Sequence, residues 1–249
     1  MADHPNKPTT FRARIRFSKT GVMRFVGHLD MMRYFQKAIR RAKLPIAYSG
    51  GFHPHQILSF ALPLGVGVTS AGEYMDIELT ERVEPDAAIT ALQAQMADGV
   101  TIDTFVYPAA SAKKAMAAVE AASYEVRIGG LLDTASKKSL SIADIKTGIG
   151  HFYHDAPEIR ITKKTKKSER QLDLKPLIEA FDVAPDAAGN PVFFLTLSAG
   201  STDNIKPELV FTHFLPYFGL SEDSCRLSIH RLDLLTRDPD GRLVSLGDV

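Results

Sequence analysis

Two histidines separated by one residue, His53 and His55, follow a pair of glycines in the segment Tyr-Ser-Gly-Gly-Phe-His-Pro-His at residues 48–55. Two more potential ligands, His28 and Asp30, lie upstream. Imidazole and carboxylate groups together suit an open metal site or an acid–base pair. Pro54 argues against a strand face for both histidines, and a polar turn and a capped helix explain the four residues as well. We therefore keep them as candidate catalytic residues and expect no metal and no cofactor.

The glycine pair, Gly50 and Gly51, predicts a loop that can present backbone N–H groups to a phosphate, with a rigid turn as the alternative. Upstream of it, cationic side chains recur at helical spacing, where they could contact phosphates or simply stabilise the end of a helix. With Lys19 in the preceding turn, these candidate anion-binding residues are Lys19, Arg33, Lys37, Arg40 and Arg41.

Charge is unevenly distributed along the chain, although the net charge is only +1. Residues 11–48 hold ten Lys and Arg against the single acid Asp30, which gives +9, whereas residues 49–110 hold one base against eight acids, which gives −7. Such a basic block suits a polyanion, but the acidic block beside it could neutralise it. A second basic run lies in a predicted hairpin, where it could contact nucleic acid or an acidic partner, or simply form a solvated loop. Its residues are Lys163, Lys164, Lys166, Lys167 and Arg170.

Hydrophobic periodicity in the first half predicts a β-α-β-β-α-β order. Residues 11–17 alternate apolar side chains with three arginines, as a strand does, and Leu29, Met32, Phe35, Ile39 and Ala42 follow a helical period. We expect the arginines to face Tyr74, Asp76 and Glu78 on a neighbouring strand, with Tyr74, Phe105 or Tyr107 as the candidate base-stacking residues. Strands at 57–64, 74–79 and 101–107 and a helix at 85–96 complete this unit.

The same order begins again after an alanine-rich segment. Strands are predicted at 124–128, 158–162, 171–174, 192–197 and 226–234, and helices at 142–153 and 207–217. The fold class is therefore α+β, with two tandem ferredoxin-like (βαββαβ) domains, the second carrying an extra strand. The predicted boundaries are a tail at 1–10, a first domain at 11–108, a linker at 109–122, a second domain at 123–235 and a tail at 236–249.

Composition excludes several classes of protein. The chain is 45% hydrophobic and 24% charged, which is typical of a globular protein and not of a disordered one. No apolar run approaches the roughly 20 residues of a membrane span, so we expect a cytoplasmic protein with no membrane partner. The single Cys225 excludes a disulfide framework and any three-cysteine cluster motif within this chain. No Ser–His–Asp, Walker or dinucleotide-binding motif is present at convincing spacing.

Short motifs within residues 11–79 resemble those of the radical SAM-linked protein family. They are Phe-Ser-Lys-Thr-Gly at 17–21, Gly-His-Leu-Asp at 27–30, Arg-Arg at 40–41, the segment at 48–55, Ala-Leu-Pro-Leu-Gly at 61–65 and Glu-Tyr-Met-Asp at 73–76. Looser matches follow at 162–164, 173–176, 206–208 and 229–231. Members are fused to, or encoded beside, a radical SAM protein, so the resemblance implies a radical SAM partner on a separate chain.

Radical SAM chemistry needs a cluster on three closely spaced cysteines, so this chain cannot be the radical enzyme. We favour a non-catalytic RNA-binding or substrate-presenting accessory protein of a radical SAM enzyme, in RNA modification or processing. One alternative is an enzyme that acts on RNA or a nucleotide through His28, Asp30, His53 and His55. Another is an adaptor that binds only protein.

Overall fold

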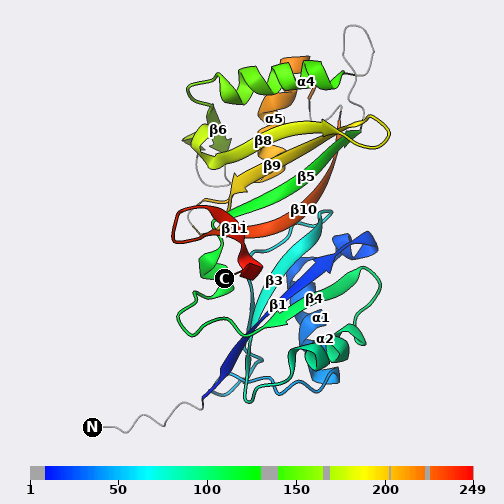
Figure 1. The fold of residues 1–249 in the computed structure, drawn as a ribbon, viewed down its shortest axis with the longest axis vertical. Coiled ribbons are helices and arrows are strands. Elements are labelled where there is room, and N and C mark those ends of the chain that lie inside the picture. The colour runs from blue at the N-terminus through cyan, green and yellow to red at the C-terminus, as the bar shows by residue number, and fades with distance from the viewer. Residues whose placement is uncertain (1–8, 130–139, 165–168, 202, 222–224, 249) are drawn as a thin grey trace, which may run out of the picture. The chain divides into compact units, whose positions relative to one another are not determined.

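The computed structural model describes residues 9–129, 140–164, 169–201, 203–221 and 225–248. These residues form a mixed α+β fold, which confirms the predicted class (Figure 1). The chain divides into two compact units: unit 1 is Met1–Val119 with Thr236–Val249, and unit 2 is Glu120–Leu235. No helix among the described residues is long and apolar enough to cross a membrane.

Unit 1 is built on an antiparallel sheet in which β1 lies between β4 and β3, and β2 also pairs with β3. Its strands are β1 (Phe11–Lys19), β2 (Leu58–Phe60), β3 (Thr69–Leu79), β4 (Val100–Val106) and β11 (Leu243–Ser245). Its helices are α1 (His28–Arg41), α2 (Pro85–Gln93) and α3 (Ala115–Ala118), with short 3₁₀ turns at Gly21–Phe25 and Leu246–Asp248.

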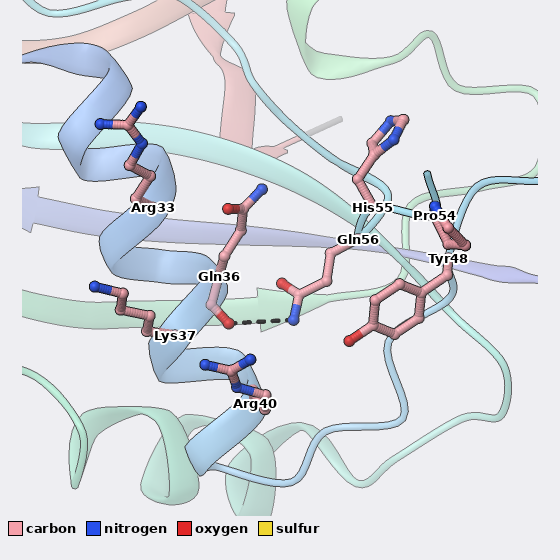
Figure 2. Close-up of a pocket in the computed structure, with 8 residues that line it drawn as sticks. All are labelled: Arg33, Gln36, Lys37, Arg40, Tyr48, Pro54, His55 and Gln56. Carbon is pink, nitrogen blue, oxygen red and sulfur yellow. Dashed lines mark hydrogen bonds between the residues drawn. The ribbon is translucent and has the colours of Figure 1, made fainter. Parts of the chain in front are cut away.

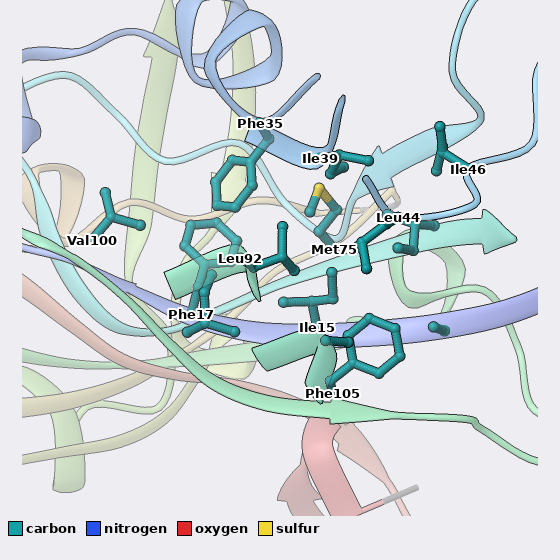
Figure 3. Packing of buried hydrophobic residues seen from close by; sticks show 14 of the residues in the cluster. Ile15, Phe17, Phe35, Ile39, Leu44, Ile46, Met75, Leu92, Val100 and Phe105 are labelled. Carbon is teal, nitrogen blue, oxygen red and sulfur yellow. The ribbon is translucent and has the colours of Figure 1, made fainter. Parts of the chain in front are cut away.

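The core of unit 1 lies between one face of this sheet and the helices α1 and α2 (Figure 3). The alternation predicted for β1 holds, because Ala13, Ile15 and Phe17 are buried in that core. The buried face of α1 carries Met31, Phe35, Ala38 and Ile39. The prediction that Leu29 shares this face is wrong, since its side chain is 66% exposed. Leu29 and Phe35 are six positions apart in the helix, which places the two roughly 120° apart around the axis.

The other face of β1 carries the arginines, and the predicted register is observed. Arg12, Arg14 and Arg16 lie opposite Glu78, Asp76 and Tyr74 respectively. Arg14 is 1% exposed and donates from Nε to Asp76 Oδ1 at 2.9 Å. Cross-strand pairing with Asp76 therefore takes up Arg14.

Segments expected as a linker and a tail pack on this face. The backbone N–H of Ala115, in α3, donates to Asp76 Oδ2 at 2.7 Å. Arg14 Nη1 donates to the carbonyl of Leu246 at 3.2 Å, and Leu246 is fully buried. These contacts correct the expectation that residues 236–249 form a tail. The predicted tail at 1–10 falls almost wholly on residues 1–8, which lie outside the described residues.

Unit 2 has a four-stranded antiparallel sheet in the order β10-β5-β9-β8, packed against α4 and α5. Buried phenylalanines join the two layers: Phe152, which follows α4, and Phe211 and Phe214 of α5 all contact Phe181 of β8. The elements are β5 (Ala121–Gly129), α4 (Ile142–Ile149), a π-helical turn (Gly150–His154), β8 (Ile178–Pro185), β9 (Pro191–Ser198), α5 (Pro207–Phe214), a 3₁₀ turn (Leu215–Phe218) and β10 (Arg226–Arg237).

Two strands outside this sheet, β6 (Arg160–Lys164) and β7 (Glu169–Asp173), pair with each other, and a 3₁₀ turn (Lys175–Leu177) follows them. The strand β8 was not predicted from the sequence. A register irregularity between Ile178 and Ala180 interrupts the alternation that would have revealed this edge strand.

Candidate nucleic-acid interface

A hollow of about 340 Å³ lies between α1 and the loop that follows it in unit 1 (Figure 2). Its cationic side comes from α1, and its other side comes from the loop between α1 and β2. The lining residues are Arg33, Gln36, Lys37, Arg40, Tyr48, Pro54, His55 and Gln56.

The helix places its cations together because its opposite face is held in the core. Arg33, Lys37 and Arg40 follow one another at intervals of four and three residues, which puts them on one side of a helix. All three are exposed, and Figure 2 shows them along one side of α1. Arg33 donates to Asp30 at 3.3 Å, an exposed pair that solvent screens. Three of the four cations in the stripe predicted from the sequence therefore border a concave surface.

The loop is closed by a short hydrogen-bonded ladder. Tyr48 and Gln56 form an isolated antiparallel bridge, and Ser49 N donates to the carbonyl of His55 at 2.8 Å. The Ser49 hydroxyl lies 2.8 Å from His55 Nδ1 and accepts from the backbone N–H of His55 at 3.1 Å. At the tip, Gly51 has a φ of 99°, a conformation that favours glycine. Gly50 and Gly51 thus shape the loop, while other residues line the hollow.

Gln56 forms the floor on the loop side. It is only 7% exposed, and its Nε2 donates to the backbone carbonyl of Gln36 at 3.1 Å (Figure 2). Its Oε1 accepts no hydrogen bond from the described residues. A buried acceptor without a donor costs about 1–3 kcal/mol, so this oxygen favours a ligand or water that can donate to it.

Arg41 does not join the other three cations. Its Nε donates to Gln95 Oε1 at 3.2 Å, and its Nη2 donates to the carbonyl of Gln95 at 3.3 Å. One residue along a helix is a rotation of about 100°, so Arg41 faces the segment after α2 while Arg40 faces the hollow.

Comparison with known proteins places the chain in a family. Residues 12–207 match the family described as "Uncharacterized protein conserved in bacteria (DUF2344)". The chain belongs to the DUF2344 family. A search of curated proteins found no match. A chain in the structure described as "Crystal Structure of a Cbf5-Nop10-Gar1 Complex" is similar at 11% identity and a TM-score of 0.49, over 88% of the DUF2344 chain and 47% of that chain. The DUF2344 chain thus spans about half the length of the protein to which it is similar.

The four candidate catalytic residues of this DUF2344 chain lie at different places. His55 lines the hollow, and His53 is exposed in the loop beside it. Asp30 pairs with Arg33, while the ring of His28 packs against Phe60 at 5.3 Å between centroids. Within the described ranges, no group of three or more His, Cys, Asp or Glu residues is placed to hold a metal ion. The structure therefore does not bring these four residues into one site.

Lys19, predicted to bind an anion, is instead 2% exposed and donates from Nζ to the carbonyl of Val26 at 2.7 Å. It lines a second cavity with His28 and the 3% exposed Glu73, a residue that was not among the predicted site residues. That cavity has a volume of about 20 Å³, which is room for one water molecule. The buried Lys19 ammonium thus holds the turn before α1 and is not available to a polyanion.

The sheet of this DUF2344 chain offers no aromatic platform at the predicted positions. Tyr74 is 1% exposed and Phe105 is 2% exposed. The hydroxyl of Tyr107 donates to the carbonyl of Val83 at 2.9 Å and accepts from its N–H at 2.8 Å. The base-stacking mode of single-strand binders that expose aromatics on a sheet is therefore closed to Tyr74 and Phe105.

The second basic run falls largely outside the described residues. Lys166 and Lys167 lie between β6 and β7 in residues 165–168, which the structure does not describe. The backbones of Lys163 and Arg170, and those of Lys164 and Glu169, are paired across the two strands. The proposed role of this run in binding stays a prediction.

Proposed function

We propose that this chain is an RNA-binding accessory protein that holds RNA phosphates in the hollow between α1 and the loop at residues 48–56. One observation carries the proposal: three cations on a single helix face border a concave surface whose other side is formed by a loop with an exposed tyrosine. Cations grouped in a hollow raise the local concentration of a polyanion more than scattered cations do.

The charges in the hollow support this function because buried ion pairs within the described part of unit 1 do not neutralise them. In the described part of the chain, Lys37 and Arg40 form no ion pair, and Arg33 has only its exposed pair with Asp30. Each phosphate that such a cation neutralises releases counterions, which makes binding depend on salt.

The remaining elements of the proposal come from the strand order and the family resemblance. In each unit the observed order matches a βαββαβ arrangement, with β4-β1-β3 and β2 beside β3 in unit 1 and β10-β5-β9-β8 in unit 2. We therefore interpret the units as ferredoxin-like, a fold that supports many functions. The resemblance favours a radical SAM enzyme as the partner that would act on the bound RNA, since this chain has one cysteine.

The test is fluorescence anisotropy with a labelled single-stranded RNA over a series of salt concentrations. The variant combines Arg33→Ala, Lys37→Ala and Arg40→Ala. Loss of three phosphate contacts should weaken binding at low salt and reduce the log–log salt slope by about 2, at about 0.7 per contact. The matched control, Lys114→Ala with Lys146→Ala and Lys206→Ala, removes the same charge from exposed positions elsewhere.

Absence of RNA binding by the wild-type protein would overturn the proposal and favour the protein-binding adaptor. Equal weakening by the two triple variants would also overturn it, because binding would then follow net charge and not the hollow. Cleavage or modification of the RNA by the purified chain alone would replace the accessory role with an enzymatic one. A preparation with stoichiometric iron would contradict the assignment of the cluster to a partner.

A further inference from the structure

We propose that the hollow takes one unstacked nucleotide of a single strand, with the base on the ring of Tyr48, its polar edge at Gln56 and its phosphates at Lys37 and Arg40. This inference rests on the proposed function and specifies the kind of RNA that the site accepts. It predicts a preference for single strands over duplexes that phosphate contacts alone would not produce.

Tyr48 offers the base a free aromatic surface. Its side chain is 53% exposed, although it belongs to the same bridge that closes the loop. Its ring makes no aromatic or cation contact within the described residues. Figure 2 shows Tyr48 across the hollow from Arg40, with its hydroxyl directed toward α1. An exposed aromatic that faces cations is the pairing used by proteins that bind single strands, since bases stack on the ring while cations hold the backbone.

The bridge to Gln56 holds Tyr48 in place. The loop is anchored to β3 on both sides, because Ala47 N donates to the carbonyl of Glu78 at 2.7 Å and Glu78 N donates to the carbonyl of Ile57 at 3.0 Å. Because these bonds fix the backbone on either side of Tyr48, little conformational entropy is lost when a base stacks on the ring.

Gln56 adds a polar contact that phosphate binding does not require. Gln56 lines the hollow and its Nε2 is held by Gln36, while its Oε1 is buried without a donor among the described residues. A phosphate oxygen can only accept a hydrogen bond, so it cannot satisfy this oxygen. The ring N–H and amino groups on the edges of bases are donors and can do so.

The size of the hollow suits one unpaired nucleotide. About 340 Å³ lies near the lower end of the roughly 300–1,000 Å³ typical of small-ligand pockets, which suits one nucleotide. In duplex RNA the base faces are stacked on one another and are not free to stack on the ring of Tyr48. An unpaired base, in contrast, can enter between α1 and the loop.

The experiment compares three labelled ligands of equal strand length: a single-stranded RNA, an abasic ribose-phosphate strand of the same charge, and an RNA duplex, whose two strands together carry twice that charge. Tyr48→Ala should weaken binding of the single-stranded RNA about five- to hundredfold, which corresponds to one lost stacking contact. Tyr48→Phe keeps the ring and should bind like the wild type. Neither variant should change binding of the abasic strand, because that strand has no base to stack.

Gln56→Met, which keeps the length of the side chain and removes the acceptor, should weaken binding of single-stranded RNA but not of the abasic strand. Far-UV circular dichroism on each variant reports whether unit 1 is folded, and Tyr48→Phe serves as the control because it preserves packing. If all three ligands bind equally and Tyr48→Ala has no effect, the single-nucleotide site is refuted while the phosphate-binding function stands. If none of the three binds, the proposed function itself fails.

Discussion

The buried ion pair between Arg14 and Asp76 allows a direct test of how unit 1 is held together. Asp76 accepts from Arg14 Nε at 2.9 Å, from Arg14 Nη2 at 3.4 Å and from the N–H of Ala115 at 2.7 Å. Both side chains of the pair are at least 95% buried, with exposures of 1% and 5%. Asp76→Ala should leave the guanidinium without its carboxylate in a site that excludes water. We expect a loss of about 3–5 kcal/mol in the free energy of unfolding.

The assay is equilibrium unfolding in urea, followed by far-UV circular dichroism because the chain contains no tryptophan. With a slope of about 2–3 kcal/mol per molar urea, the midpoint of Asp76→Ala should fall by about 1–2 M. A matched control comes from the exposed pair of Arg33 and Asp30, which are 71% and 68% exposed. Asp30→Ala should cost less than about 1 kcal/mol, since solvent screens that pair.

A double variant separates the two sources of the loss. Arg14→Met with Asp76→Leu removes both charges and fills the space with apolar groups, so it should be more stable than Asp76→Ala alone. The reasoning is refuted if Asp76→Ala costs less than about 1 kcal/mol, or if the double variant is the less stable of the two. Either result would mean that an uncompensated buried charge is not what makes Asp76 necessary.

Three further predictions concern the acid side of stability, the turn before α1 and the second basic run. Asp186 accepts from the N–H of Asn190 at 2.9 Å, from the N–H of Ala188 at 2.9 Å and from Arg127 at 2.8 Å, and these bonds, that of Asn190 foremost, lower the pKa of Asp186. The contribution of Asp186 to the free energy of unfolding is therefore complete above the ordinary aspartate pKa of about 4 and is lost as the pH falls through the lower pKa of the folded state. Asp186→Asn should flatten this part of a plot of stability against pH, and an unchanged plot would contradict the assignment. Gly99 has a φ of 92°, and a Cβ there would lie 2.6 Å from the carbonyl oxygen of Thr20, so Gly99→Ala should cost more than about 1–2 kcal/mol in urea unfolding. In RNA titrations, alanine at all four lysines of the second run should reduce the salt slope by about 0.7 per phosphate contact and leave the circular dichroism spectrum unchanged, whereas an unchanged slope would make the run a solvated loop. The four lysines are Lys163, Lys164, Lys166 and Lys167.

The candidate site was predictable from the sequence to the extent that it depends on one helix and one loop. The spacing of Arg33, Lys37 and Arg40 places them on one face regardless of what surrounds them. The nearby glycine pair marks the turn of the loop. Gln56 was not predictable, because a glutamine in a loop is ordinarily exposed and only the approach of α1 buries it. Arg41 was predicted to share a face with the other three cations. In the folded chain it lies beside the segment after α2, where it donates to Gln95.

The sequence by itself determined which side of each local element is apolar. The alternation in β1 and the helical period in α1 follow from backbone geometry, so they needed no knowledge of the partners. Only the tertiary structure decided what covers the other side. Asp76 is 62 residues from Arg14 in the chain, and Leu246 is 232 residues from it, yet both contact its guanidinium. Periodicity describes a face but contains no information on partners so distant, which is why the buried Tyr74 and the packed C-terminal segment became visible only in the folded chain.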